Sequence, residues 1–341
     1  MPRWLFALLV AALVFYTDDY IIAGILPELA DDLGVSEAQA GQLVTVFSLT
    51  VAVSAPVAAV SLIRVRRSTL FTVTLGIFAC ANLAAAATSD YWVLMALRVI
   101  AALCAGASTP AIFSWTAQQA PPEKIGRYIS VVAMGVTGAI ALGVPLGTLI
   151  SHAVSWRVSF LALAVCALVT IAAIRLTMVT DTRGEEEVPV TEQLRALTSS
   201  PVALTLAVNV VAMSGSMMAF TYLSPFLEGA APGHELRALT FAASGACGII
   251  GVWAGGVLTD RFGPVRTVVL GLGVLAAGCA GCLLLWTQAP LSSGTAVTAL
   301  VVAGAVQALG AFSLSPAFTA RLSTTAGDGA DAAIALNTSG T

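Results

Sequence analysis

Charged side chains are scarce in this sequence. Asp, Glu, Lys and Arg together make up 10% of its 341 residues, whereas hydrophobic residues make up 58%. Soluble domains carry about 25% charged residues, so the composition excludes an ordinary soluble globular protein and predicts a polytopic membrane protein. The formal net charge of -3 adds little, because the positions of the charges matter more than their sum.

Residues and motifs that commonly carry chemistry are also few. The two histidines, His152 and His234, fall in predicted outer loops, and no nucleotide-binding GxxxxGK[ST] motif or nucleophile triad occurs. Cys279 and Cys282 have CxxC spacing but no second pair or histidine nearby, so we expect the six cysteines to be buried free thiols. The sequence therefore predicts no enzyme activity, no metal, no cofactor and no nucleic-acid partner.

Ten apolar stretches are long enough to span a bilayer, which takes about 20 residues. The first has no small-residue cleavage site, so we interpret it as a retained helix and not a signal peptide. An eleventh begins at Ala332–Leu336. The predicted spans are Trp4–Leu26, Gly41–Ile63, Leu70–Ala87, Tyr91–Thr116, Tyr128–Ile150, Val158–Ile174, Val202–Leu223, Leu239–Leu258, Thr267–Trp286 and Gly294–Phe318.

The distribution of basic residues predicts the orientation. With a cytoplasmic N-terminus, Arg157 and Arg237 lie outside, Arg98 lies within a span, and the other arginines and the single lysine lie inside. This asymmetry follows the positive-inside rule. The excess of arginine over lysine and the abundance of alanine are typical of a GC-rich bacterial genome, so we expect a location in a bacterial cell membrane.

The two halves of the chain resemble each other. Pro27 precedes Arg64 by 37 residues, and Pro225 precedes Arg261 by 36. We therefore predict an N-terminal six-helix bundle at residues 1–175, a cytoplasmic linker at 176–200 and a C-terminal bundle at 201–341 that is incomplete in this chain. Repeats with a substrate site at their interface are common in secondary transporters.

The most specific motif follows the eighth span at the predicted inner face. Its order, G-x-L-x-D-R-x-G-x-x-R, resembles the signature gating loop of the major facilitator superfamily. A basic inner loop alone would explain the arginines but not this order. The counterpart at 61–67 in the first half lacks the aspartate and the glycines. The candidate gating residues are Gly256, Asp260, Arg261, Gly263 and Arg266.

Further motifs resemble the drug:proton antiporter branch, in particular its arabinose-efflux and chloramphenicol-resistance type. They are the segments at 17–27, 32–36, 121–127 and 155–157, and Arg98 in the fourth span. The fifth span resembles the antiporter motif of that branch. Glycines four residues apart share a helix face and permit close packing, and a proline can kink the span. The motif residues are Gly135, Gly138, Gly143, Pro145 and Gly147.

Asp18 and Asp19 stand in an otherwise apolar first span, where ionisable groups are costly and mark functional sites. Asp18 lies about 13 Å and Arg98 about 10 Å below the outer ends of their helices, so one of the two carboxylates is expected to pair with Arg98. Opening a cavity to either side would change the surroundings of that carboxylate and so load or release a proton. The alternative is a static pair that pins the first helix to the fourth.

Eight polar or adaptable residues are candidates for the lining of a substrate cavity. Methionine offers flexible apolar contact, and the polar side chains could add hydrogen bonds. Each is also a plausible helix-packing residue. The candidates are Gln42, Thr45, Thr109, Asn209, Met213, Met217, Tyr222 and Gln307.

The resemblance implies an all-α major-facilitator fold of two pseudo-symmetric six-helix bundles. It further implies alternating access, driven by protons, that exports small amphipathic compounds, with a chloramphenicol-like antibiotic as one candidate. The alternatives are an efflux permease for sugars or nucleosides and a non-transporting sensor or truncated inactive product. The expected partners are the substrate, protons and the lipid bilayer, and we expect a monomer. Because family members have twelve helices, we expect this chain to be a fragment or a truncated gene product.

Overall fold

The computed structural model describes residues 2–62, 65–121, 125–178, 200–230, 234–287 and 294–325, and the elements within these ranges are helices. Ten helical segments in these ranges are long and apolar enough to cross a membrane, which confirms the predicted number. Contacts divide the chain into two compact units. Unit 1 comprises Met1–Ala139 and Leu146–Glu187, and unit 2 comprises Ile140–Pro145 and Val188–Thr341. Most of the predicted linker and the start of the eleventh span lie outside the described residues.

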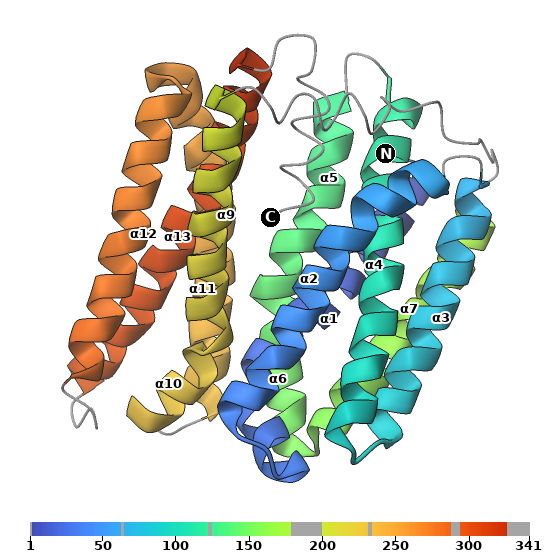
Figure 1. Ribbon diagram of the computed structural model, residues 1–341, viewed down its shortest axis with the longest axis horizontal. Coiled ribbons are helices and arrows are strands. Elements are labelled where there is room, and N and C mark those ends of the chain that lie inside the picture. The colour runs from blue at the N-terminus through green and yellow to red at the C-terminus, as the bar shows by residue number, and fades with distance from the viewer. Residues whose placement is uncertain are drawn as a thin grey trace. The chain divides into compact units, whose positions relative to one another are not determined.

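Unit 1 is a bundle of antiparallel helices (Figure 1). In this bundle α1 packs against α2, α5 and α7, and α3 packs against α4 and α7. Phenylalanine side chains fill its core, with the rings of Phe15 and Phe78 packed edge to face at 5.0 Å. The helices are α1 (Arg3–Leu33), α2 (Glu37–Ser61), α3 (Arg67–Ala87), α4 (Tyr91–Gln119), α5 (Ile125–Gly138), α6 (Val144–Ala153) and α7 (Trp156–Thr177).

Local sequence signals set the helix ends at one end of unit 1. Gly34 ends α1 in the left-handed conformation, with φ of 64°, which a glycine adopts without strain. Ser36 and Gln39 then form a capping box that starts α2. The Asp90 side chain accepts hydrogen bonds from two backbone N–H groups in the first turn of α4. These caps satisfy backbone groups that the helices themselves leave unpaired.

An ion pair joins three segments at the same end of unit 1. The Arg157 Nη1 atom lies 2.6 Å from Asp32 Oδ2. The other guanidinium nitrogen donates to the Thr88 carbonyl and the Ser89 hydroxyl, each at 3.1 Å. The Trp156 indole also donates to Asp32, at 3.2 Å. Arg157 therefore ties α7 to the end of α1 and to the α3–α4 connection.

The fifth span is not one continuous α-helix. A π-helical turn at Ala139–Gly143 separates α5 from α6. Pro145 follows directly, and it has no N–H with which to continue the α-helical hydrogen-bond pattern. Because the altered hydrogen-bond register lies just before this proline, we attribute the π-helical turn to it.

Unit 2 is built around its last helix. In this bundle α13 packs against α11, α12 and α9, as Figure 1 shows. A short helix, α10, follows the seventh span where the sequence predicted a loop. The helices are α9 (Ser200–Thr221), α10 (Leu223–Ala230), α11 (His234–Phe262), α12 (Pro264–Trp286) and α13 (Gly294–Thr325).

Glycines bring the backbones of α11 and α13 close together. A methyl group placed on Gly251 would lie 2.6 Å from the Leu309 carbonyl oxygen. One on Gly255 would lie 2.9 Å from the Ser313 Cα atom. Both distances are too short for a side chain, so glycine is required at these positions for the observed packing.

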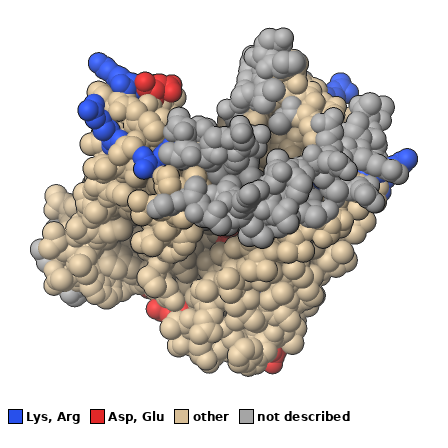
Figure 2. Space-filling model, turned by 45° about the horizontal axis from the view of Figure 1, so that its top comes forward, with Lys and Arg blue, Asp and Glu red and all other residues tan. Residues whose placement is uncertain are grey.

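The outer surfaces of the helices are apolar, as a lipid environment requires. Large hydrophobic side chains such as Val211 and Trp253 are about 70% exposed. On the face shown in Figure 2, the basic side chains of the described residues, drawn blue, lie toward the top of the picture, and the surface below them is mostly tan. The six cysteines are free thiols, but Cys80 and Cys166 are exposed, so the prediction that all six are buried is wrong. An apolar helix in a membrane buries only part of its circumference against protein, which the sequence pattern alone does not resolve.

Candidate functional site

Arg98 on α4 reaches across to α1 and pairs with Asp18. The Arg98 Nη1 atom lies 2.7 Å from Asp18 Oδ2. Its Nη2 atom donates to the Asp18 backbone carbonyl at 2.9 Å. One guanidinium thus contacts both the side chain and the main chain of the same residue, which fixes α4 against α1 at this level.

The pair is isolated from solvent. Asp18 is 0% exposed and Arg98 is 1% exposed. The Phe47 ring of α2 covers the guanidinium, with its centroid 4.2 Å from Arg98 Cζ, which is within the range of a cation–π contact. Charges removed from water in this way must be paired, because an unpaired ion in a medium of low dielectric constant is very costly.

Asp19 has different surroundings. Adjacent residues on a helix point about 100° apart, and Asp19 is half-buried where Asp18 is fully buried. Among the described residues, no cation lies within salt-bridge distance of Asp19. The rings of Tyr16 and Tyr20 stack beside it on the same helix, with centroids 6.1 Å apart. The structure therefore pairs Arg98 with Asp18 and not with Asp19, the two carboxylates that the sequence left as alternatives.

Asn82 is a site residue that sequence reasoning missed. It lies on α3, is 1% exposed, and its side chain interacts with Asp18. The Asn82 amide nitrogen also donates to the Phe78 carbonyl at 3.1 Å. A single asparagine in an otherwise apolar span was the one available signal, since polar residues are rare at this depth.

Three antiporter-motif glycines lie against α1. A methyl group on Gly135 would lie 2.7 Å from the Leu9 carbonyl oxygen, and one on Gly147 would lie 2.6 Å from Ile21. Gly138 is less confined, because a methyl group there would lie 3.3 Å from the Leu13 side chain. Gly143 belongs to the π-helical turn and Pro145 to the first turn of α6. The structure therefore brings the motif helix against the helix that carries Asp18.

The predicted gating loop joins α11 to α12. Gly263 has a φ of 84°, which favours glycine, and Pro264 then starts α12. Asp260, Arg261 and Arg266 are exposed, and within the described part of the chain none of them forms an ion pair. Among the described residues, the charged side chains of this loop therefore have no partner of opposite charge. Gly256 also has open space around it, whereas its neighbour Gly255 contacts α13.

The candidate cavity residues are divided between the two units. In unit 1, Gln42 and Thr45 are exposed and Thr109 is half-buried. In unit 2, the Gln307 amide donates to the Ser216 hydroxyl at 2.9 Å, so it joins α13 to α9. The others in unit 2 are Asn209 and Met213, which are buried, and Met217 and Tyr222, which are half-buried.

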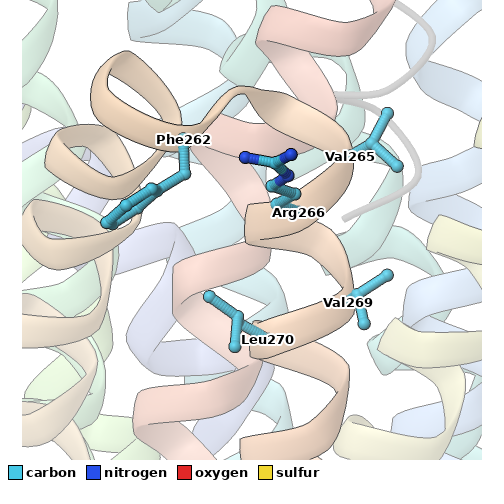
Figure 3. Close-up of a pocket in the computed structure, with 5 residues that line it drawn as sticks. All are labelled: Phe262, Val265, Arg266, Val269 and Leu270. Atoms are coloured by element: carbon cyan, nitrogen blue, oxygen red, sulfur yellow. The ribbon is translucent and has the colours of Figure 1, made fainter.

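A shallow recess of about 360 Å³ lies at the start of α12. Figure 3 shows Phe262, at the end of α11, and Leu270 to the left, Val265 and Val269 to the right, and Arg266 between them. Apart from Arg266 its lining is apolar, and none of the candidate cavity residues contributes to it. We do not assign it as the substrate site.

Comparison with known proteins places the fold and the motifs in one family. The sequence profile of the Major Facilitator Superfamily matches residues 8–341. The chain belongs to the Major Facilitator Superfamily. The superfamily resemblance inferred from the motifs is therefore confirmed, and so is the all-helical major-facilitator fold.

Relatives within the superfamily include transporters and a resistance protein. An uncharacterized MFS-type transporter of Bacillus subtilis, YbcL, is 33% identical over 79% of this chain and 69% of its own. A chloramphenicol resistance protein of Streptomyces lividans is 33% identical over 76% of this chain and 68% of its own. The putative transporter AraJ of Escherichia coli is 29% identical, over 73% of this chain and 63% of its own.

Solved superfamily structures share the fold at low sequence identity. A bacterial homologue of the human lysosomal transporter Spinster, in an inward-facing and unoccupied conformation, gives a TM-score of 0.74 at 18% identity. This match covers 99% of the chain and 80% of that structure. The nucleoside transporter NupG gives a TM-score of 0.79 at 11% identity, over 99% of the chain and 87% of that structure.

Proposed function

We propose that this Major Facilitator Superfamily member is a proton-coupled exporter of small amphipathic compounds that works by alternating access. The observation that carries the proposal is the pair formed by Asp18 and Arg98, which is buried inside a membrane-spanning bundle. Ionisable groups at this depth are rare and commonly serve proton relays or substrate paths. The energy would come from an ion gradient, because the sequence has no nucleotide-binding motif.

The proton site in this proposal is Asp18. The carboxylate exchanges its ion pair with Arg98 for a bound proton as the surroundings of α1 change between the two access states. Arg98 lies on a different helix, so its distance from Asp18 can respond to a movement of α4 against α1. The glycine contacts of Gly135 and Gly147 support this role, because they let the motif helix pack directly on the helix that carries Asp18.

The substrate is proposed from the relatives. One relative is named a chloramphenicol resistance protein, and another, of Pasteurella multocida, is named a probable sugar efflux transporter. A chloramphenicol-like compound is our first candidate and a sugar the second. Uptake of each compound into everted membrane vesicles that contain the chain would decide between them.

The test of coupling uses two separate variants, Asp18→Asn and Asp19→Asn. We expect Asp18→Asn to abolish pH-driven transport and Asp19→Asn to retain at least part of it, because Asp18 is the carboxylate paired with Arg98. A protonophore applied to the unmodified protein should stop export. Full coupling in both variants would show that neither carboxylate carries the proton, and export that survives the protonophore would exclude proton coupling.

A further inference from the structure

Two arginines of the loop between α11 and α12 lie beside the apolar recess at the start of α12. Arg266 is part of the lining and stands at the centre of the view in Figure 3. The Arg261 guanidinium lies over the ring of Phe262, another lining residue, with Cζ 5.4 Å from the ring centroid. Both arginines are exposed, and among the described residues neither forms an ion pair. The edge of the recess therefore carries positive charge that the described part of the chain does not neutralise.

A neighbouring recess adds a charge of the same sign. It has a volume of about 240 Å³, shares Val265 and Val269 with the first recess, and has Arg321 of α13 in its lining. The Arg321 Nε atom donates to the Thr205 hydroxyl at 3.0 Å, which holds this guanidinium at the edge of the second recess. The loop at 260–266 carries one carboxylate, Asp260, against its two arginines. The loop and the two recesses together therefore favour an anion.

The rest of the first recess is suited to hydrocarbon. Its other lining residues are Phe262, Val265, Val269 and Leu270, and each of them is between 44% and 63% exposed. A pocket for a soluble ligand encloses most of that ligand's surface, whereas this open recess can cover only one side of a ligand. An acyl chain in a bilayer needs no enclosure, because other lipid chains surround its remaining surface. The recess therefore fits a lipid better than a soluble anion.

We propose that the start of α12 binds an anionic phospholipid, with its phosphate group at Arg261 and Arg266 and its acyl chains along the two recesses. Arginine can bind a phosphate group through two parallel N–H···O hydrogen bonds. The positive-inside rule predicts that this loop faces the cytoplasm, and basic pockets on that side of membrane helices bind the headgroups of anionic lipids. The site belongs to unit 2, and the inference depends neither on transport nor on Asp18.

The test measures lipid binding to the purified protein in detergent. Native mass spectrometry would give the affinity of the first lipid bound, with phosphatidylglycerol and phosphatidylcholine of the same acyl chains as probes. We expect phosphatidylglycerol to bind more tightly and to raise the thermal unfolding temperature, because a ligand of the folded state stabilises it. Inorganic phosphate should not raise that temperature, because it has no acyl chain. Equal binding of the two lipids, or an equal effect of inorganic phosphate, would overturn the proposal.

Variants of Arg266 test the contact with the phosphate group. Arg266→Gln should weaken the binding of phosphatidylglycerol about fivefold, because one basic residue at an anionic lipid surface contributes about 1 kcal/mol. Arg266→Lys keeps the charge and should restore most of the binding. The matched control is Arg175→Gln, at an exposed arginine near the end of α7 in unit 1, and it should leave the affinity unchanged. Equal losses in Arg266→Gln and Arg175→Gln would overturn the proposed site.

Two further variants test the acyl-chain contact and the sign of the charge. Val269→Asn places a polar group in both recesses and should weaken the binding of phosphatidylglycerol, whereas Val211→Asn, at an exposed valine of α9, should not. Asp260→Asn removes the carboxylate of the loop and keeps both arginines, so it should strengthen binding, and it provides a test if Arg266→Gln does not fold. Equal effects of the two valine variants, or weaker binding in Asp260→Asn, would contradict the proposal.

Discussion

Arg98 is bound by three groups within the bundle: the Asp18 carboxylate, the Asp18 carbonyl and the Phe47 ring. Any one of these contacts could hold a guanidinium loosely. Together they fix both its position and its plane, so the charge cannot move to solvent without a change in the helix packing. At the scale of single residues, the pair is therefore a structural element as well as a candidate proton site.

This double role predicts a large effect of Arg98 on stability. Arg98→Met keeps much of the side-chain volume but leaves the Asp18 charge without a partner. Removing one member of a buried pair costs about 3–5 kcal/mol, and thermal unfolding in detergent would measure it. The matched control is Arg175→Met, at an exposed arginine near the end of α7, for which we expect almost no change. Equal effects of the two variants would contradict the structural role of the pair.

The double variant Asp18→Asn/Arg98→Met gives a second prediction, for both stability and transport. The double variant has no buried charge to leave unpaired, so it should recover part of the stability that Arg98→Met loses. It should not recover transport, because the proposed proton site is absent. A double-variant cycle measured by unfolding would give the coupling between the two residues.

At the scale of elements, close backbone approach decides how the helices of unit 2 fit together. Gly251 and Gly255 on α11 lie directly against α13, and they share a face because they are four residues apart. Gly278 on α12 also lies against α13, at the backbone of Gln307. In a bundle without a hydrophobic driving force between helices, such contacts supply much of the packing energy.

Two adjacent glycines provide a sharp test of this packing. Gly255→Ala places a methyl group against Ser313, so we expect a loss of about 1–3 kcal/mol in stability. Gly256→Ala meets no atom within 4 Å, so it should stabilise the helix by about 0.5–1 kcal/mol. Thermal unfolding of both variants would measure the difference, and shifts of the same sign would contradict the packing described for α11 and α13.

The sequence predicted elements better than the contacts between them. The length of each apolar run predicted ten spans, and the order of residues around Asp260 predicted the family. The motif includes Gly256, but which of Gly255 and Gly256 faces a neighbouring helix depends on the rotation of α11, which the sequence does not determine. Pro145 predicted a kink, whereas the π-helical turn before it depends on how the backbone re-forms its hydrogen bonds.

The site was predicted to a similar degree. Equal depth in the membrane narrowed the partner of Arg98 to Asp18 or Asp19, because depth along a helix follows from residue count. Which of the two carboxylates faces Arg98 depends on the rotation of α1 about its own axis, and only the packed structure shows that rotation. Asn82 could not be recognised for the same reason, since a lone asparagine is as suitable for joining two helices as for serving a proton site.

At the scale of the whole molecule, the basic residues predict which side of the membrane each connection faces. Ala38 lies in the first turn of α2 and Thr69 in the first turn of α3, and both are exposed. In a variant without the native cysteines, we expect Ala38→Cys to react with a membrane-impermeant maleimide in intact cells. Thr69→Cys should react only after permeabilisation, because the positive-inside rule predicts that the arginines beside it face the cytoplasm. The reverse pattern would overturn the proposed orientation.

The ion pair between α1 and α4 joins residues 80 positions apart in the chain. A ribosome adds about 5–20 residues each second, so Asp18 is made about 4–16 seconds before its counter-charge. An aspartate at the centre of a membrane helix disfavours insertion by about 2.5–3.5 kcal/mol. We therefore expect α1 to enter lipid less readily before Arg98 is made than after it. The pair between α1 and α4 thus favours an order of assembly in which the first helix is committed to the bilayer together with the fourth.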